Sequence, residues 1–380
     1  MHKMRYMRRF MPIQRDRKEV NPMISISFNG IPFEIESAVG MTIMEAARGK
    51  GIHIPYLCNK PFLKSVGACR ICLVEIEGNP KLLPACTTPI SSGMAIHTNS
   101  ERVKSARRAV VELLLIRHPL KCFSCPSNGK CELQDVAYEL GIESSPFTED
   151  GDECVKFTID DNNPFYERDL NKCILCGRCI RVCHEKARIH AIDFQNRGIS
   201  TAVQPARPLE NSDCVFCGQC VGVCPVGALS EKTSKGRGRP WELSRVKTVC
   251  SYCGVGCTLE ILVNSKTRRI ANVVTNHGSN ITQNKGRSCV KGRFAWQFIE
   301  SPERVVTPLI RGENGIFRGA SWNEAYKYIA DSMNNIKSEH GPDSIGFFSS
   351  ARCTNEENYM LQKFARQVIG TNNIDHCAHL

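Results

Sequence analysis

The chain has 380 residues, of which 22 are cysteine, and its formal net charge is +12. This length predicts two or three domains. The longest apolar stretch, 109–116, is interrupted by Glu112 and is too short to span a bilayer. Since no secretory signal is recognised, we expect a cytoplasmic protein whose cysteines bind metal rather than form disulfides. Structural zinc and iron–sulfur clusters are the two alternatives.

Two segments carry much of the positive charge. Residues 1–22 contain seven Lys or Arg and two Asp or Glu. Arg8 and Arg9 hint at a twin-arginine export signal, but polar residues follow them, so we expect a disordered basic tail or a true start at Met23. The second segment, Lys232–Arg239, is a Gly-rich linker. Because neither segment interleaves aromatic with basic residues, nucleic-acid binding is not favoured.

The first segment after the tail has the pattern of a small β-rich domain. Apolar and polar residues alternate over 24–28 and again over 31–35, and the Asn-Gly pair between them is a strong hairpin signal. Thr42 and Glu45 form a capping box, which predicts a short helix that ends near Gly49.

Further elements are predicted on both sides of the cysteine-rich region. Ser100 is placed to cap a helix that runs to Arg117. The expected apolar face of that helix is Val103, Ala106, Val110 and Leu114. Near the C-terminus, Trp322–Ile336 reads as an amphipathic helix, Ser344–Phe348 as a buried strand, and Glu356–Ile369 as a helix ended by Gly370. This alternation is typical of the start of an α/β domain.

The first cysteine group has the spacing C-x10-C-x2-C-x13-C and consists of Cys58, Cys69, Cys72 and Cys86. Gly67 and Ala68 precede the close pair and predict a tight loop in which the backbone can approach sulfide. Four thiolates suit a [2Fe–2S] cluster, with zinc as the alternative. The spacing resembles the N-terminal [2Fe–2S] domain of the large iron–sulfur subunit of complex I and of iron-only hydrogenases.

The second group has the spacing H-x3-C-x2-C-x5-C and consists of His118, Cys122, Cys125 and Cys131. One histidine and three cysteines can hold zinc or a [4Fe–4S] cluster. Its place directly after the first group resembles the His-ligated [4Fe–4S] site of the same families, which implies that His118 is a ligand.

The third and fourth groups repeat C-x2-C-x2-C-x3-C about 41 residues apart. Their members are Cys173, Cys176, Cys179 and Cys183, and then Cys214, Cys217, Cys220 and Cys224. This is the pattern of bacterial two-cluster ferredoxins, in which the fourth cysteine of each run ligates the other cluster. We therefore expect Cys224 to complete the first cube and Cys183 the second. His184 stands where the first run would carry a proline.

The fifth group, Cys250, Cys253, Cys257 and Cys289, has the spacing C-x2-C-x3-C-x31-C, and Cys289 opens Cys-Val-Lys-Gly-Arg-Phe. Both features resemble the proximal [4Fe–4S] domain of molybdopterin-dependent formate dehydrogenases. In that family a lysine at the position of Lys291 lies between the cube and the pterin and helps electrons to pass, so the resemblance implies an electron-relay role for Lys291.

The five groups use 19 cysteines and one histidine, which suits one [2Fe–2S] and four [4Fe–4S] clusters. Cys154, Cys353 and Cys377 remain, and we interpret them as ordinary thiols. Ligating cysteines are thiolates, and a four-cysteine cube carries on the order of −2 when oxidised. Much of the formal charge of +12 is therefore expected to offset cluster charge rather than to attract nucleic acid.

The C-terminal stretch, from Ser349 and through Gly370–Leu380, also resembles formate dehydrogenase catalytic subunits. In that family Asn-x-Asp-His-Cys-Ala-x-Leu is followed at once by the cysteine or selenocysteine that ligates molybdenum or tungsten. The hypothesis is that the sequence stops at a selenocysteine codon and that these 380 residues are catalytically incomplete. The resemblance implies a Mo- or W-bis-pterin guanine dinucleotide in the full-length protein only; which residues here would bind it is unknown.

The implied function is the iron–sulfur relay of a formate dehydrogenase or CO2 reductase. Because no dinucleotide fingerprint is present, NAD(P) or ferredoxin reduction requires a flavin- and iron–sulfur-containing diaphorase-type subunit or a ferredoxin, with hydrogenase subunits as a further alternative. The rival functions are a complex I large iron–sulfur subunit, a stand-alone electron-transfer module, an iron-only hydrogenase and a zinc-binding scaffold.

The expected fold class is an α+β multidomain iron–sulfur protein. Its expected segments are the basic tail (1–22), a β-grasp [2Fe–2S] ferredoxin-like domain (23–100), a [4Fe–4S] segment with one histidine and three cysteine ligands (101–150), a two-cluster bacterial ferredoxin domain (151–235), a proximal [4Fe–4S] domain (246–305) and the truncated start of a molybdopterin-binding α/β domain (306–380).

Overall fold

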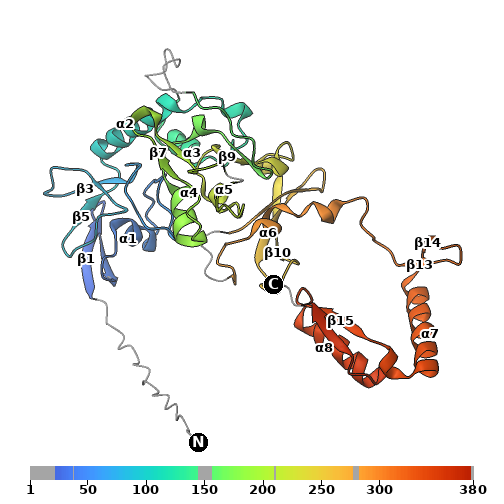
Figure 1. Cartoon of the computed structure of the whole chain (residues 1–380). Coiled ribbons are helices and arrows are strands. Elements are labelled where there is room, and N and C mark those ends of the chain that lie inside the picture. Colours follow the sequence, from blue (N-terminus) through green and yellow to red (C-terminus); the bar gives the residue numbers. More distant parts are fainter. Residues whose placement is uncertain (1–21, 37, 144–155, 209–210, 277–281, 378–380) are drawn as a thin grey trace, which may run out of the picture. The chain divides into compact units, whose positions relative to one another are not determined.

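The computed structural model describes residues 22–36, 38–143, 156–208, 211–276 and 282–377 (Figure 1). The chain separates into two compact units, one formed by residues 1–56 and 65–111 and the other by residues 57–64 and 112–380. The predictions made for the basic tail up to residue 21, for Cys154 and for the last three residues lie outside the described residues. Among the residues described, no helix is both long and apolar enough to cross a membrane.

The first unit is built on a five-stranded sheet with the order β2-β1-β5-β3-β4. Its strands are β1 (Met23–Phe28), β2 (Ile31–Glu36), β3 (Leu73–Ile76), β4 (Leu83–Pro84) and β5 (Ala95–His97). β1 pairs with β2 in an antiparallel hairpin and with β5 in parallel. The predicted hairpin is confirmed, and Asn29 and Gly30 turn it with φ values of 52° and 84°. The expected β-grasp arrangement of a mixed sheet with one packed helix is also confirmed.

That packed helix is α1 (Ile43–Gly49). The predicted capping box is present, since the Thr42 amide donates to Glu45 Oε2 at 2.8 Å and the Glu45 amide donates to Thr42 Oγ1 at 3.3 Å. The apolar side of α1 is buried against the sheet, in one core with Ile26 and Phe28. A local cap and a tertiary core therefore fix the same element.

Helix α2 (Glu101–Arg117) follows the predicted bounds, and Ser100 Oγ accepts from the Val103 amide at 3.3 Å. Its buried face differs from the predicted one. The side chains that are buried are Val103, Arg107, Val111 and Leu115, spaced by four. The other residues of the predicted apolar face, Ala106, Val110 and Leu114, are only partly buried. Arg107 is buried instead, and its guanidinium donates to the carbonyl of Leu73 at 2.7 Å.

The second unit carries the remaining cysteine groups on short elements. Its helices and strands up to residue 231 are α3 (Glu132–Glu139), β6 (Tyr166–Arg168), α4 (Arg178–Arg181), the π-helical turn η3 (Val182–Ala187), β7 (Asp193–Gln195), β8 (Ala202–Gln204), α5 (Gln219–Val223) and β9 (Leu229–Glu231). β6 pairs with β9, and β7 with β8, both antiparallel. The internal repeat is visible in the backbone: φ is 52° at both Leu175 and Phe216, and 67° and 68° at Gly177 and Gly218.

An antiparallel sheet follows, with the order β10-β11-β12. Its elements are β10 (Leu243–Val249), β11 (Thr258–Asn264), β12 (Ile270–Val274) and the short helix α6 (Val290–Phe294). Leu259, Ile270, Val273 and Trp296 form its buried core, against which Cys250 and Cys257 pack. The fifth cysteine group therefore lies at the edge of an apolar core.

The C-terminal part begins as an α/β fold, as expected from the sequence. Its elements are β13 (Leu309–Arg311), β14 (Phe317–Gly319), α7 (Trp322–His340), β15 (Phe347–Ser350), α8 (Asn355–Phe364), the π-helical turn η10 (Ala365–Ile369) and β16 (Ile374–Cys377). β15 and β16 are parallel, which makes a β–α–β unit with α8 as its crossover.

One C-terminal prediction needs correction, and a second is confirmed in its end point. The strand predicted at Ser344–Phe348 begins only at Phe347, because Pro342 starts a 3-10 turn in which the Ile345 amide donates to the Pro342 carbonyl at 3.2 Å. The helix predicted to end at Ile369 does end there, but its last turn is π-helical, and Gly370 caps it at φ 93°.

Candidate iron–sulfur sites

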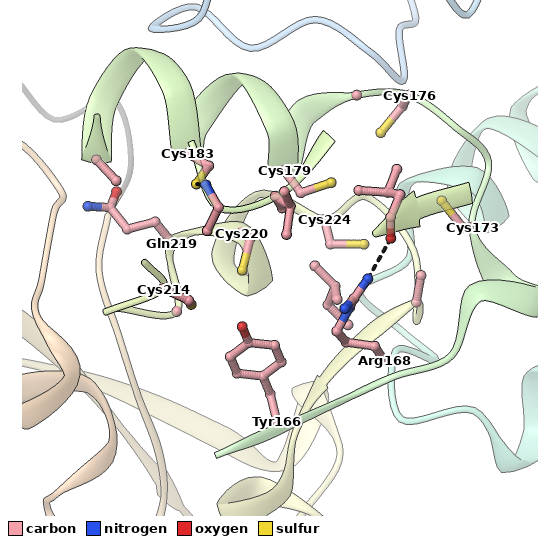
Figure 2. A pocket seen from close by; sticks show the side chains of 18 of the residues that line it. Tyr166, Arg168, Cys173, Cys176, Cys179, Cys183, Cys214, Gln219, Cys220 and Cys224 are labelled. Carbon is pink, nitrogen blue, oxygen red and sulfur yellow. Dashed lines mark hydrogen bonds between the residues drawn. The ribbon is translucent and has the colours of Figure 1, made fainter. Parts of the chain in front are cut away.

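One apolar cavity in the second unit gathers the third and fourth cysteine groups. All eight of their cysteines line it, together with apolar side chains such as Val203 and Val226 (Figure 2). The cysteines come from the loops before α4 and α5, from these two helices, and from the residues that follow them, Cys183 in η3 and Cys224 at the C-cap of α5. Two sequence runs about 41 residues apart are thus folded around a single space.

Within this cavity, cysteines of the two sequence runs act on one another electrostatically. Cys224 lies close enough to Cys176 and Cys173 for their charges to act on it. Cys183 acts in the same way on Cys217 and Cys220 of the other run. The last cysteine of each run is therefore near two cysteines of the other run.

The electrostatics of the cavity favour neutral thiols until a metal is bound. Burial raises the pKa of the Cys176 thiol to about 11 and that of Cys220 to about 12. It raises the pKa values of Cys179 and Cys224 as well, and neighbouring cysteines add to the rise. Four thiolates can share such a space only around a positive core, so this donor set fits a metal–sulfur cluster that displaces the protons on binding.

Two buried residues beside the cavity were missed by the sequence analysis. Tyr166 on β6 donates its hydroxyl hydrogen bond to the Cys220 sulfur, and burial raises the pKa of this tyrosine far above its usual range. Arg168 donates to the Val203 carbonyl at 2.5 Å. Figure 2 shows both side chains pointing toward the cysteines from below. Nothing in the spacing of β6 signals these roles, because they arise from pairing with β9.

Gly218 provides a stability test of the cluster loops. A Cβ here would lie 2.5 Å from Arg293 Cδ and 2.6 Å from a Phe294 ring carbon, whereas at Gly177 it would meet only the Phe194 ring, at 3.4 Å. We expect Gly218→Ala to cost about 3 kcal/mol from left-handed backbone and overpacking together. The matched Gly177→Ala should cost about 1–2 kcal/mol. The urea concentration at which visible cluster absorbance is lost measures the stability of both variants. Equal losses of stability would contradict the predicted clash of a Cβ at Gly218 with Arg293 and Phe294.

The second group is brought together only in part. Burial raises the pKa of the Cys131 thiol, and Cys125 and Cys122 contribute to the rise, so these three are neighbours. His118 lies beside Lys172, and burial lowers the pKa of its imidazole. Its Nδ1 atom is buried without a hydrogen-bond partner. An orphaned buried ring nitrogen is what a histidine ligand leaves when its metal is absent.

The loop of the second group is closely packed. A Cβ at Gly227 would lie 2.7 Å from Cys125 Sγ, so only glycine fits there. Arg239 donates to the carbonyl of Cys125 at 2.9 Å and to that of Phe123 at 3.0 Å. The basic linker 232–239 thus makes contacts within the protein, and Lys232 also pairs with Asp161 at 2.7 Å.

The fifth group is brought together completely. The charges of Cys289 and Cys253 act on Cys250, whose pKa is raised chiefly by burial, and all three act on Cys257. The Cys250 amide donates to the Cys257 carbonyl at 2.8 Å. Lys291, in the first turn of α6, is exposed to solvent on the same helix that Cys289 begins.

Three cysteines of the first group, Cys69, Cys72 and Cys86, belong to the first unit, and Cys72 and Cys86 are buried in its core. Cys58 is buried in the segment 57–64, which belongs to the second unit. The predicted tight loop is present: Gly67 has φ 62°, and a Cβ there would touch the Thr87 side chain at 3.4 Å.

Two thiols outside the five groups, Cys353 and Cys377, belong to the C-terminal part, whose Ala351 carbonyl oxygen would lie 3.0 Å from a Cβ at Gly254 in the loop of the fifth group. Cys353 and Cys377 are exposed. A crevice at the carboxyl ends of β15 and β16 is lined by Ser349, Asp375 and His376, among others. Ligands of open α/β sheets bind at such strand ends. In the part of the chain that the structure describes, no three His, Cys, Asp or Glu side chains converge on the position of a single metal ion.

Five family models match the chain, and they follow one another along it. They are the 2Fe-2S iron-sulfur cluster binding domain (21–101), the NADH-ubiquinone oxidoreductase-G iron-sulfur binding region (107–146), the 4Fe-4S dicluster domain (172–228), the molybdopterin oxidoreductase Fe4S4 domain (243–301) and molybdopterin oxidoreductase (304–380). The expected series of domain types is thereby confirmed.

Individual relatives match more than half of the chain. The NADPH-Fe(3+) oxidoreductase subunit alpha of Geobacter sulfurreducens is 38% identical over 360 residues, which cover 94% of this chain and 40% of that protein. The putative formate dehydrogenase YrhE of Bacillus subtilis is 36% identical over 396 residues, which cover 93% and 40%. A chain of an NAD+-reducing [NiFe]-hydrogenase in the H2-reduced state matches with a TM-score of 0.52 and 28% identity, over 57% of this chain and 90% of that one.

The chain spans about 40% of the length of the curated relatives named above. Within that span it carries [2Fe–2S]-type and [4Fe–4S]-type domains and the beginning of a molybdopterin domain, so it contains an iron–sulfur electron-transfer module. These matches show that the chain carries an Fe4S4 domain and part of a domain of the molybdopterin oxidoreductase type, preceded by a complex I-type iron–sulfur region, and that it is similar to proteins named as formate dehydrogenases.

Proposed function

We propose that the chain is the iron–sulfur relay of a formate dehydrogenase or CO2 reductase, which connects a Mo- or W-pterin centre with an NAD(P)- or ferredoxin-linked partner. The observation that carries this proposal is the apolar cavity lined by all eight cysteines of the ferredoxin-type runs. A water-poor space with eight thiols and few charged groups suits redox clusters. The relative named as a formate dehydrogenase supports the pterin end of the proposed electron path, and the relative named as an NADPH-Fe(3+) oxidoreductase subunit supports the NAD(P)-linked end.

The proposed ligands follow the five groups, and the clusters would supply one-electron transfer. Cys58, Cys69, Cys72 and Cys86 would hold a [2Fe–2S] cluster, and His118, Cys122, Cys125 and Cys131 a [4Fe–4S] cluster. Cys173, Cys176, Cys179 and Cys224 would hold the first ferredoxin cube, and Cys214, Cys217, Cys220 and Cys183 the second. Cys250, Cys253, Cys257 and Cys289 would hold the proximal cube.

The protein's own contribution is to set the environment of each sulfur. The Ala191 amide donates to Cys183 Sγ at 3.4 Å, and Tyr166 donates to Cys220. Such hydrogen bonds favour the more negative, reduced state and so raise the potential. Lys291 is exposed two residues after Cys289, which suits the proposed role of a relay toward a pterin bound beside α6.

Removing the tyrosine hydroxyl tests this environment. Tyr166→Phe keeps the ring, which stacks near Phe294 with centroids 6.4 Å apart, and deletes only the hydrogen bond to Cys220. We expect one [4Fe–4S] signal to titrate at a more negative potential with unchanged iron content. The exposed Tyr328→Phe is the control. An unaltered set of potentials in Tyr166→Phe would show that the hydroxyl has no influence on the cluster.

The cluster content is the direct test of the relay. Anaerobically purified chain should be brown and contain about 18 iron atoms if all five clusters are bound. Electron paramagnetic resonance of the reduced sample should show [2Fe–2S] and [4Fe–4S] signals. A colourless protein with zinc and no iron would overturn the proposal and establish the zinc scaffold instead.

A second candidate is an NADPH-linked electron-transfer subunit without formate chemistry. It is favoured by the relative named as an NADPH-Fe(3+) oxidoreductase subunit alpha. The complex I-type region at 107–146 fits either candidate. The two differ in the whole protein, where formate-dependent reduction of a dye is expected only for the first.

A further inference from the structure

Arg181, the last residue of α4, is buried between two candidate ligand segments. Its Nη2 atom donates to the Cys58 carbonyl at 2.5 Å and to the Cys176 carbonyl at 3.3 Å. Its Nη1 atom donates to the Lys64 carbonyl at 2.7 Å. One guanidinium therefore holds a residue of the first cysteine group and a residue of the third by their backbones.

The segment 57–64 has other anchors on the ferredoxin helices. Leu63 packs in a buried apolar cluster with Val182 and Val223. The Lys64 amide also donates to a carboxylate oxygen of Glu185 at 3.0 Å. Because these contacts remain when Arg181 is changed, the segment does not depend on the guanidinium alone to stay in place.

A chain of charges runs beside the same residues. Arg178, fully buried, donates to both oxygens of Glu132 at 2.8 and 2.6 Å, and Lys60 donates to Glu132 at 2.9 Å. Each member is a near neighbour of a candidate ligand: Lys60 follows Cys58, Glu132 follows Cys131 and Arg178 lies between Cys176 and Cys179. Glu132 thus offsets the charges of two cations, Arg178 and Lys60. The hydrogen bonds of the Arg181 guanidinium, in contrast, all go to backbone carbonyls.

A buried guanidinium whose partners are carbonyls keeps its full charge and acts strongly at short range. Electrostatic interactions grow as the local dielectric falls, and Arg stays protonated under all ordinary conditions. Cluster potentials respond to nearby charge and hydrogen bonding. Arg181 can therefore bias the reduction of clusters on both Cys58 and Cys176.

We propose that Arg181 is a positioning residue for two candidate cluster ligands of different cysteine groups: it holds Cys58 and Cys176 through their carbonyls and places one positive charge beside both residues. This rests on the proposed relay function and adds a residue that no ligand pattern includes. The fork of the guanidinium is needed for the geometry, since a lysine amine cannot replace two nitrogens that serve three carbonyls.

Three variants of the full chain test the proposal. Arg181→Met removes the charge and the fork, Arg181→Lys keeps only the charge, and Arg197→Met removes one exposed arginine from the same domain. The readouts are iron content and a redox titration followed by electron paramagnetic resonance. In Arg181→Met we expect the [2Fe–2S] signal and one [4Fe–4S] signal to shift together to more negative potential, by about 59 mV for a tenfold change in a one-electron equilibrium.

Arg181→Lys should recover much of that shift, and Arg197→Met should cause none. Unchanged potentials in an iron-replete Arg181→Met, or the same shift in Arg197→Met, would overturn the proposal. If Arg181→Met loses iron, Arg181→Lys decides: a residual shift of both signals away from their wild-type potentials supports the role of the guanidinium, and wild-type potentials for both signals refute it. A wild-type chain without iron would instead refute the relay function itself.

Discussion

Cys224→Ser is expected to remove the cube that belongs mainly to the other sequence run. Cys224 lies after Cys214, Cys217 and Cys220 in the sequence, yet the cysteines that contribute to its raised pKa are Cys176 and Cys173 of the other run. Loss of one ligand from an oxygen-sensitive cube is expected to release it, so iron should fall by about four atoms per chain. Iron analysis and the [4Fe–4S] resonance measure this.

Paired substitutions separate crossed from uncrossed ligation. Cys224→Ser combined with Cys173→Ser should lose no more iron than either single variant, because both cysteines serve one cube. Cys224→Ser combined with Cys214→Ser should lose about eight atoms, because two cubes are affected. If each run bound its own cluster, the two results would be reversed.

Exposed thiols provide the matched control. Cys353→Ser and Cys377→Ser change cysteines that lie outside the five groups and are open to solvent. Neither should alter iron content or any resonance. A loss of iron in either variant would show that the ligand assignment is incomplete.

The features that could be predicted from the sequence are local. The hairpin at Asn29-Gly30 and the capping box at Thr42 depend on residues a few positions apart, and both are present. The ligand spacings are local as well, because three of four cysteines in most groups lie within about ten residues. The cysteine spacings therefore predicted the kinds of domain that the family models confirm.

The features that could not be predicted depend on contacts between distant segments. Arg181 and Cys58 are separated by 123 positions, and Arg293 and Glu231 by 62. Arginines are usually exposed, so a sequence offers no reason to bury these. A buried arginine also explains why the buried face of α2 differs from the predicted one: Arg107 occupies a buried position that the apolar pattern assigns to solvent.

The strand near the C-terminus shows a different limit. Ile345 and Phe347 are both buried, and their alternation suggested a strand from Ser344. Pairing begins only where Phe347 lies opposite Ile374, because the turn at Pro342 uses the preceding backbone. An apolar pattern identifies a buried segment but does not give the residue at which its partner strand begins.

Arg293→Met is expected to be the most destabilising single change among the charged residues of the second unit. Arg293 on α6 and Glu231 on β9 are both almost fully buried, with Nη2 and Oε1 2.6 Å apart and Nε donating to the same oxygen at 2.8 Å. Arg293 Nη1 and Glu231 Oε2 are buried without a partner. The charge of each side chain is therefore compensated mainly by the other side chain of the pair.

Removing one member leaves an uncompensated charge in that site, which costs about 3–5 kcal/mol. Replacing both members by apolar residues removes both desolvation penalties, so Arg293→Met with Glu231→Met should be less destabilised than Arg293→Met alone. The control is the exposed pair Arg318–Glu324, also 2.6 Å apart, where Arg318→Met should change stability very little.

The measurement is the urea concentration at which the iron–sulfur absorbance is lost under anaerobic conditions. Because Lys291 lies two residues before Arg293 on α6, the single variant should also slow electron transfer to the fifth cysteine group, and the double variant should slow it less. If Arg293→Met and Arg318→Met lose the same amount of stability, the burial of the Arg293–Glu231 pair does not determine the cost of breaking it. If the double variant is the weakest, the pair stabilises the fold by its attraction rather than merely compensating for its own burial.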